Sequence, residues 1–95
     1  MKKVILSFLL TFLPMLASAE PVEIDGIWYR LDAKTKEAYV TYNPTVEWNT
    51  GSYYGEIVIP ASVTYENVKY NVTGIGVQAF KDSYSLTSVT IPNSI

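Results

Sequence analysis

Residues 57–63 read Ile-Val-Ile-Pro-Ala-Ser-Val, and residues 89–95 read Val-Thr-Ile-Pro-Asn-Ser-Ile. Both follow one template: an apolar residue, any residue, Ile, Pro, any residue, Ser and an apolar residue. The isoleucines before the two prolines, Ile59 and Ile91, are 32 residues apart. A phrase that recurs at a fixed spacing is typical of solenoid proteins, in which each repeat is one structural unit. We therefore expect a repeat fold that acts by surface binding rather than by chemistry.

The second copy carries the internal spacing of a leucine-rich repeat. Leu86, Val89 and Ile91 match the pattern L-x-x-L-x-L. Because side chains alternate along a strand, these three are expected to point inward, while Ser88 and Thr90 point outward. The outward pair is therefore a candidate partner-binding face.

The segment before the repeats predicts a small antiparallel meander. Its expected strands are rich in β-branched and aromatic residues and cover 22–24, 27–31 and 38–42. Asp25-Gly26 suits the positive φ angles of a tight hairpin turn between the first two strands. A loop is expected over residues 43–55, because Asn, Pro and Gly punctuate it.

A second hairpin is predicted between the two copies of the phrase. A strand over 56–59 stops at Pro60, and strands at 63–65 and 68–72 flank the turn Glu66-Asn67. Treating this hairpin as an insertion explains why the spacing exceeds the roughly 20–29 residues of a leucine-rich repeat. Gly74-Ile75-Gly76 is expected to break the strand pattern. One helical or 3-10 turn at most follows at 77–81, Phe80 covers the other side of the core, and a strand covers 86–91.

The N-terminus is predicted to direct export. Two lysines precede an apolar run at residues 4–13, which is too short to cross a bilayer, and residues 17–19 read Ala-Ser-Ala. We expect residues 1–19 to be a signal peptide cleaved before Glu20, with an uncleaved anchor as the alternative. Because the sequence has no cysteine, a lipid anchor on cysteine is excluded. The destination is the periplasm, the cell surface or the medium.

Composition removes several function classes. Residues 20–95 hold nine acidic and five basic residues, a balance that argues against nucleic-acid and anionic-membrane partners. Histidine and cysteine are absent, so imidazole catalysis, thiol nucleophiles and nitrogen or sulfur metal ligands are excluded. We expect no catalytic residue, no metal and no cofactor. An enzyme built on a carboxylate pair is a remote alternative, since no pattern brings two acids together.

Three local motifs match known functional motifs only in part or carry little functional information. Residues 74–79 fit the dinucleotide fingerprint G-x-G-x-x-A, but residues 82–85 end any helix that the fingerprint requires. Gly76 is expected instead to permit a tight corner. The acids at 20, 23 and 25 lack a calcium-loop motif and are expected to form a solvated acidic end. Asn71-Val72-Thr73 is a glycosylation sequon, which is expected to be idle if the source is bacterial.

Aromatic residues supply the remaining candidates for partner binding. Trp48, Tyr53 and Tyr54 lie in the predicted loop, and Trp and Tyr dominate interface hot spots. The alternative is that these side chains fold back over the meander as a lid on a small core. The candidate partner-binding residues are therefore Ser88, Thr90, Trp48, Tyr53 and Tyr54.

Residues 72–95 resemble a repeat of the BspA-like leucine-rich repeat family. Its units run Ile-Gly-x-x-Ala-Phe, a short turn and then Ser-Leu-Thr-Ser-Val-Thr-Ile-Pro-Asn-Ser-Val; the matching positions here are 75–76, 79–80 and 85–95. Residues 22–70 are similar to the family's usual N-terminal region. Ser83 departs from the pattern, because the family often has cysteine there. The family carries many units in series, and the resemblance implies a bacterial surface protein that binds host matrix proteins or other microbes.

Together these observations predict a mainly β fold in which an antiparallel meander caps the start of a leucine-rich-repeat solenoid. Residues 20–55 would form the meander and loop. Residues 56–95 would form a modified first repeat with the hairpin insertion and one full repeat of a truncated array. The expected function is non-enzymatic protein–protein binding or adhesion at the cell surface. The alternative is a purely structural cap of a longer solenoid, and self-association through its exposed edge is expected to be possible.

Overall fold

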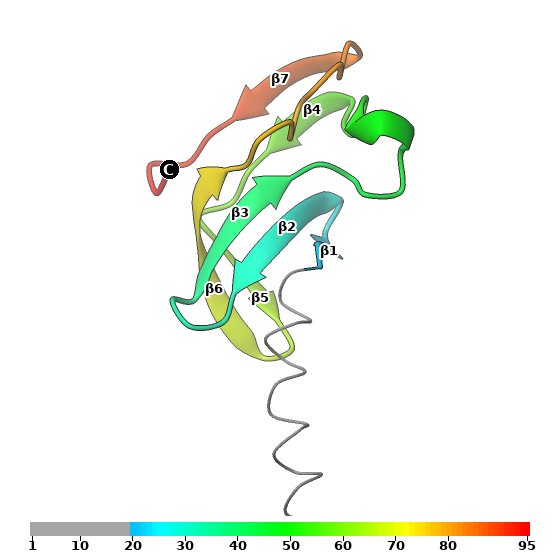
Figure 1. Cartoon of the computed structure of the whole chain (residues 1–95). Helices are drawn as coiled ribbons and strands as arrows, with labels where there is room; N and C mark the ends of the chain where they lie inside the picture. Colours follow the sequence, from blue (N-terminus) through cyan, green and yellow to red (C-terminus); the bar gives the residue numbers. More distant parts are fainter. Residues whose placement is uncertain (1–19) are drawn as a thin grey trace, which may run out of the picture.

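A computed structural model describes residues 20–95, in which seven β-strands form two sheets (Figure 1). The predicted signal peptide lies outside the described residues. The strands are β1 (Val22–Ile24), β2 (Ile27–Asp32), β3 (Glu37–Thr41), β4 (Gly55–Val58), β5 (Ser62–Tyr65), β6 (Val68–Ile75) and β7 (Leu86–Thr90), with a 3-10 helix η1 at Glu47–Asn49. The fold is mainly β, and no helix of the described part is long and apolar enough to cross a membrane.

The predicted meander is confirmed and is part of a larger, curled sheet. The five-stranded sheet has the order β1-β2-β3-β6-β5. Asp25 and Gly26 have φ angles of 52° and 88°, which suit the two-residue hairpin turn between β1 and β2. The β2–β3 turn is held by the Asp32 carboxylate, which accepts hydrogen bonds from the backbone N–H groups of Lys34 and Thr35 at 2.9 and 3.2 Å.

The predicted second hairpin is also confirmed, but it joins the meander. Glu66 and Asn67 adopt φ angles of 50° and 67° between β5 and β6. The far half of β6 then pairs in parallel with β3, from Glu37 opposite Asn71 to Val40 opposite Ile75, with a register shift on the way. The expected break at Gly74-Ile75-Gly76 is wrong in its position, because β6 continues to Ile75. The missing Gly74 side chain leaves room for the ring of Tyr39, its partner on β3.

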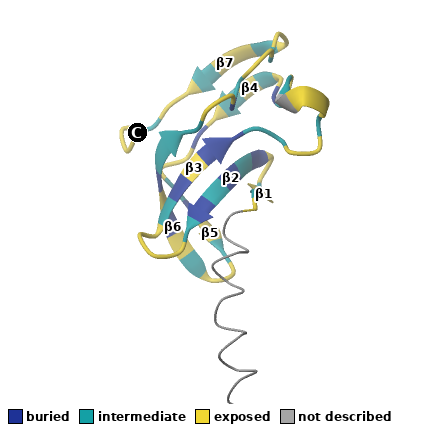
Figure 2. Ribbon diagram, in the orientation of Figure 1, coloured by how far each residue is buried: buried dark blue, intermediate teal, exposed yellow. Residues whose placement is uncertain are grey.

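The core lies on the inner face of the five-stranded sheet. Burial alternates along β2, where Ile27, Tyr29 and Leu31 are buried and the residues between them are half-buried. Val40 and Val72 from β3 and β6 are fully buried beside them. Figure 2 shows this burial concentrated on β2 and β3, with exposed turns around it.

The two copies of the repeated phrase lie side by side in the second sheet. β4 and β7 pair in parallel, with Ile57 opposite Val89 and Val58 opposite Thr90. Each pair is separated by the 32 residues that separate the phrases themselves. The backbone N–H of Ile59 continues the ladder by donating to the Thr90 carbonyl at 2.9 Å. The repeat found in the sequence is therefore a repeat in space.

The two copies differ in burial. Ile59 is 2% exposed and belongs to the core, whereas Ile91, predicted to point inward, is 52% exposed. The inward prediction is thus wrong for Ile91, because no described strand packs beyond β7 to cover it. Leu86 and Val89 are half-buried and pack against the core, as expected.

The segment between β6 and β7 forms hydrogen-bonded turns. Backbone N–H groups donate to carbonyls three residues earlier at Ala79, Lys81 and Ser83, which fits the expectation of one 3-10 turn at most. Phe80 packs against the core, and its ring lies 5.4 Å from the ring of Tyr53 between centroids.

Candidate functional site

The predicted polar face of β7 is exposed. Ser88 and Thr90 are both accessible, and Thr87 is exposed with them. In the described part of the chain, β7 pairs only with β4, so its other edge has free backbone groups. An unpaired edge of this kind accepts another strand readily. The surface combines a short polar face with an open edge.

The loop between β3 and β4, which we call the aromatic loop, carries both exposed and buried aromatic residues. Trp48 is 80% exposed and Tyr54 is 76% exposed, so both are available to a partner. Trp48 also has φ 60° and ψ 17°. The left-handed conformation costs a bulky residue roughly 1–2 kcal/mol, and such strain concentrates at functional positions.

Tyr53, which the sequence suggests as a partner-binding residue, is instead buried. Its side chain is 4% exposed and is not available to a partner. Its hydroxyl donates to the Thr41 carbonyl at 2.6 Å and accepts the backbone N–H of Trp28 at 2.9 Å. Tyr53 therefore folds back over the meander, as the alternative hypothesis for the loop aromatic residues predicts. Its hydroxyl bridges the ends of β2 and β3. Burial also raises its pKa.

The loop is fastened to the rest of the fold by hydrogen bonds. The Asn43 backbone N–H donates to the Ser52 hydroxyl at 2.9 Å, which closes the loop on itself. Gly51 and Gly55 donate from their backbone N–H groups to the carbonyls of Lys81 and Ser85, both at 2.9 Å. The exposed aromatic residues are therefore presented from a fixed backbone.

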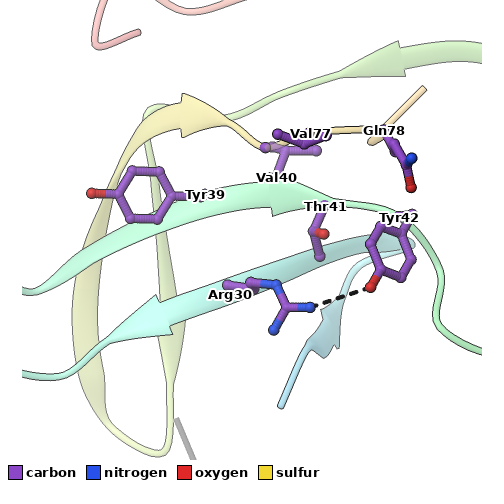
Figure 3. Close-up of a pocket in the computed structure, with 8 residues that line it drawn as sticks. Arg30, Tyr39, Val40, Thr41, Tyr42, Val77 and Gln78 are labelled. Atoms are coloured by element: carbon purple, nitrogen blue, oxygen red, sulfur yellow. Dashed lines mark hydrogen bonds between the residues drawn. The ribbon is translucent and has the colours of Figure 1, made fainter. Parts of the chain in front are cut away.

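The first of two hollows lies between the outer face of β3 and the segment after β6. It has a volume of about 490 Å³, and Figure 3 shows Arg30, Tyr39, Tyr42, Val77 and Gln78 around it. The Arg30 guanidinium donates to the Tyr42 hydroxyl at 3.4 Å and lies 5.9 Å from the centre of its ring. Tyr42 therefore contacts Arg30 through both its hydroxyl and its ring, and the guanidinium is part of the lining of this hollow.

The second hollow, which we call the Trp28 hollow, lies between β1, β2, the aromatic loop and β4. It has a volume of about 330 Å³ and is lined by Glu23, Gly26, Trp28, Asn43, Ser52, Tyr53, Tyr54 and Ile57. Its lining contains one carboxylate and no lysine or arginine. The sequence analysis singled out Tyr53 and Tyr54 of this group but missed Trp28. The alternation of β2, which places Trp28 and Arg30 on its outer face, was the signal that could have found it.

The other motifs lack the geometry of a chemical site. Turns follow Gly76 where the dinucleotide fingerprint needs a helix, and Gly76 instead donates its N–H to the Val40 carbonyl at 2.7 Å. Among residues 20–95, no three side chains of the kinds that bind metals gather closely enough to hold an ion.

Comparison with known protein families, curated proteins and solved structures gives no match for this chain. Its function is therefore inferred from the surfaces described above and from the repeat in its sequence.

Proposed function

We propose that this chain is an exported, non-enzymatic leucine-rich-repeat protein that binds protein partners at the cell surface. The observation that carries the proposal is the parallel pairing of β4 and β7 at the same 32-residue offset as the repeated phrases. In a solenoid, each repeat contacts its neighbours in this way, and the stacked strands form the binding surface. The pairing therefore supports the family resemblance.

The polar face of β7 is the proposed contact surface. Ser88 and Thr90 offer hydroxyl groups beside an edge that accepts a strand. Two short strands present far less than the roughly 800 Å² per partner of a standard interface. We therefore expect weak binding by this chain, with a dissociation constant above about 1 µM for a matrix-protein partner.

A solid-phase assay against immobilised extracellular-matrix proteins tests this surface. Purified protein is expected to show weak, saturable binding that the double variant S88E/T90E loses. The matched control is Thr64→Glu, which places a carboxylate at another exposed strand position, on β5. Binding that survives S88E/T90E, or that falls equally in T64E, would contradict the assignment of this face.

Export is tested separately. Expression in a bacterial host with the native leader is expected to release protein whose mass corresponds to a chain starting at Glu20. A cytoplasmic product that retains residues 1–19 would refute the export part of the proposal.

The second candidate function is a structural cap of a longer solenoid. It is favoured by the asymmetry of the core, which is closed at Ile59 but open at Ile91. Appending a second copy of residues 73–95 after Ile95 would supply the next strand. If the meander is a cap, this strand pairs with β7 and raises the melting temperature by about 4–8 °C for each kcal/mol gained.

The control for this experiment is the same extension with aspartate in place of its copies of Leu86 and Val89, since charged residues cannot enter the core. Equal melting temperatures for the two extensions would count against the cap.

A further inference from the structure

We propose that the Trp28 hollow binds the cationic side chain of a protein partner, a lysine or an arginine. The inference rests on the proposed function in one respect: it takes the partner to be a protein. Neither Ser88 nor Thr90 lines the hollow, so it can be tested by itself with small probes.

The first support is the placement of a carboxylate beside an aromatic ring. Glu23 on β1 and Trp28 on β2 are directly opposite in the antiparallel register, so their side chains are neighbours on the outer face of the sheet. Tyr54 lines the same hollow from the aromatic loop and is 76% exposed. A cation is attracted both by a carboxylate and by the faces of Trp and Tyr rings.

The second support is that the hollow is held in shape without a ligand. The hydroxyl of Tyr53 binds the backbone N–H of Trp28 and the carbonyl of Thr41. The opposite wall is fixed by the hydrogen bond from the Asn43 N–H to the Ser52 hydroxyl. A preformed site loses little conformational entropy when a partner side chain enters.

The third support is the charge of the hollow. Within residues 20–95, Glu23 makes no ion pair and its carboxylate has no hydrogen-bond partner. No lysine or arginine lines the hollow to neutralise it. After the effect of burial, the negative charge of Glu23 contributes to raising the pKa of Tyr53 below it. Glu23 is therefore the only charged residue in the lining of the hollow.

These features favour a cation over other ligands. An anionic group would meet the uncompensated carboxylate of Glu23. A divalent metal needs more ligands than one carboxylate, and the described residues gather no such group. A volume of about 330 Å³ is at the lower end of ligand pockets, which suits the end of one side chain.

The indole N–H resonances provide the measurement, because the chain has two tryptophans, one in the hollow and one outside it. Nitrogen-15 spectra are recorded while Nα-acetyl-lysine methylamide or its arginine analogue is added at constant ionic strength. The Trp48→Phe variant assigns the two signals. We expect the Trp28 signal to shift saturably at millimolar probe and the Trp48 signal to stay in place.

The matched pair of variants is Glu23→Gln and Glu56→Gln. Both remove one exposed carboxylate, but Glu56, next to Ile57 on β4, is not part of the lining of the hollow. Glu23→Gln is expected to weaken probe binding about two- to fivefold, the range of an exposed ion pair, and Glu56→Gln to leave it unchanged.

Three results would overturn the inference. They are the absence of a saturable shift at Trp28, equal weakening by the two variants, and an equal shift with the uncharged probes Nα-acetyl-norleucine methylamide or N-acetylglucosamine. The last probe would reveal a sugar site instead. Loss of matrix-protein binding in S88E/T90E would not move the Trp28 signal, so the two proposals fail independently.

Discussion

The two sheets of this molecule differ in how deeply their residues are buried. In the five-stranded sheet, buried residues from β2, β3 and β6 form a core in which Val40 and Val72 are fully buried. In the two-stranded sheet, no residue of β4 or β7 is fully buried, and Val58 is 65% exposed. The repeated phrase that reveals the fold class thus lies largely in the less buried sheet. Only the first copy reaches the five-stranded sheet, because its Ser62 and Val63 begin β5.

The largest effect is expected from equal truncations in the two sheets. Val72→Ala removes two methyl groups from a fully buried site and is expected to cost about 2–3 kcal/mol of unfolding free energy. Val89→Ala acts at a half-buried site on β7 and is expected to cost less than about 1 kcal/mol. Urea denaturation followed by circular dichroism measures both. Equal losses would show that the two sheets contribute equally to stability, and would contradict the difference between them described above.

The second largest loss of stability is expected at Tyr53, which links the loop before β4 to the five-stranded sheet. Tyr53→Phe keeps the ring against Phe80 but removes the hydroxyl between Trp28 and Thr41. Leaving these backbone groups without that partner is expected to cost about 1–3 kcal/mol. Tyr54→Phe is the control, because its side chain is largely exposed and its hydroxyl has no partner among the described residues. Similar melting temperatures for the two variants would rule out the bridging role.

Much of this arrangement could be predicted from the sequence because its signals are local. The Asp25-Gly26 and Glu66-Asn67 turns were predicted from residue types that tolerate positive φ, and the structure has them there. Ser88 and Thr90 were placed outward by strand alternation, and both are exposed. Each of these inferences depends on a few neighbouring residues.

The rest could not be predicted because it depends on contacts between distant segments. Nothing near β6 indicates that its far half pairs with β3, although this pairing joins the hairpin to the meander. The loop has no periodicity, so the sequence could not tell that Tyr53 turns inward and Tyr54 outward. The Trp28 hollow was missed for the same reason, since its walls come from β1, β2, the loop before β4 and β4 itself.

A smaller effect is expected at alkaline pH in the five-stranded sheet. Burial, followed by the charges of Tyr53 and Asp25, raises the pKa of Tyr29 to about 12 from its ordinary value of 10.0. Between pH 10 and 12 the unfolded chain releases this proton while the folded chain keeps it, so stability falls as pH rises. The loss assigned to Tyr29 is expected to stay below about 2 kcal/mol. Tyr29→Phe removes this component, and urea titrations at pH 8 and pH 11 should show a smaller decrease for the variant than for the parent chain.

The smallest effect is expected where β3 meets β6, the junction on which the larger sheet depends. A Cβ atom at position 74 would lie 2.7 Å from the Cδ1 atom of Tyr39. Because Tyr39 is 37% exposed, its ring can turn away, and Gly74→Ala is expected to cost about 1 kcal/mol.

A double-mutant cycle tests whether this cost comes from the ring. In the Tyr39→Ala background the clash is absent, so the added Gly74→Ala change should be neutral or slightly stabilising, as alanine is in a strand compared with glycine. If Gly74→Ala costs the same in both backgrounds, the ring does not explain the glycine. The cost would then come from another contact at the junction of β3 and β6, because the φ angle of Gly74 lies outside the left-handed region that favours glycine.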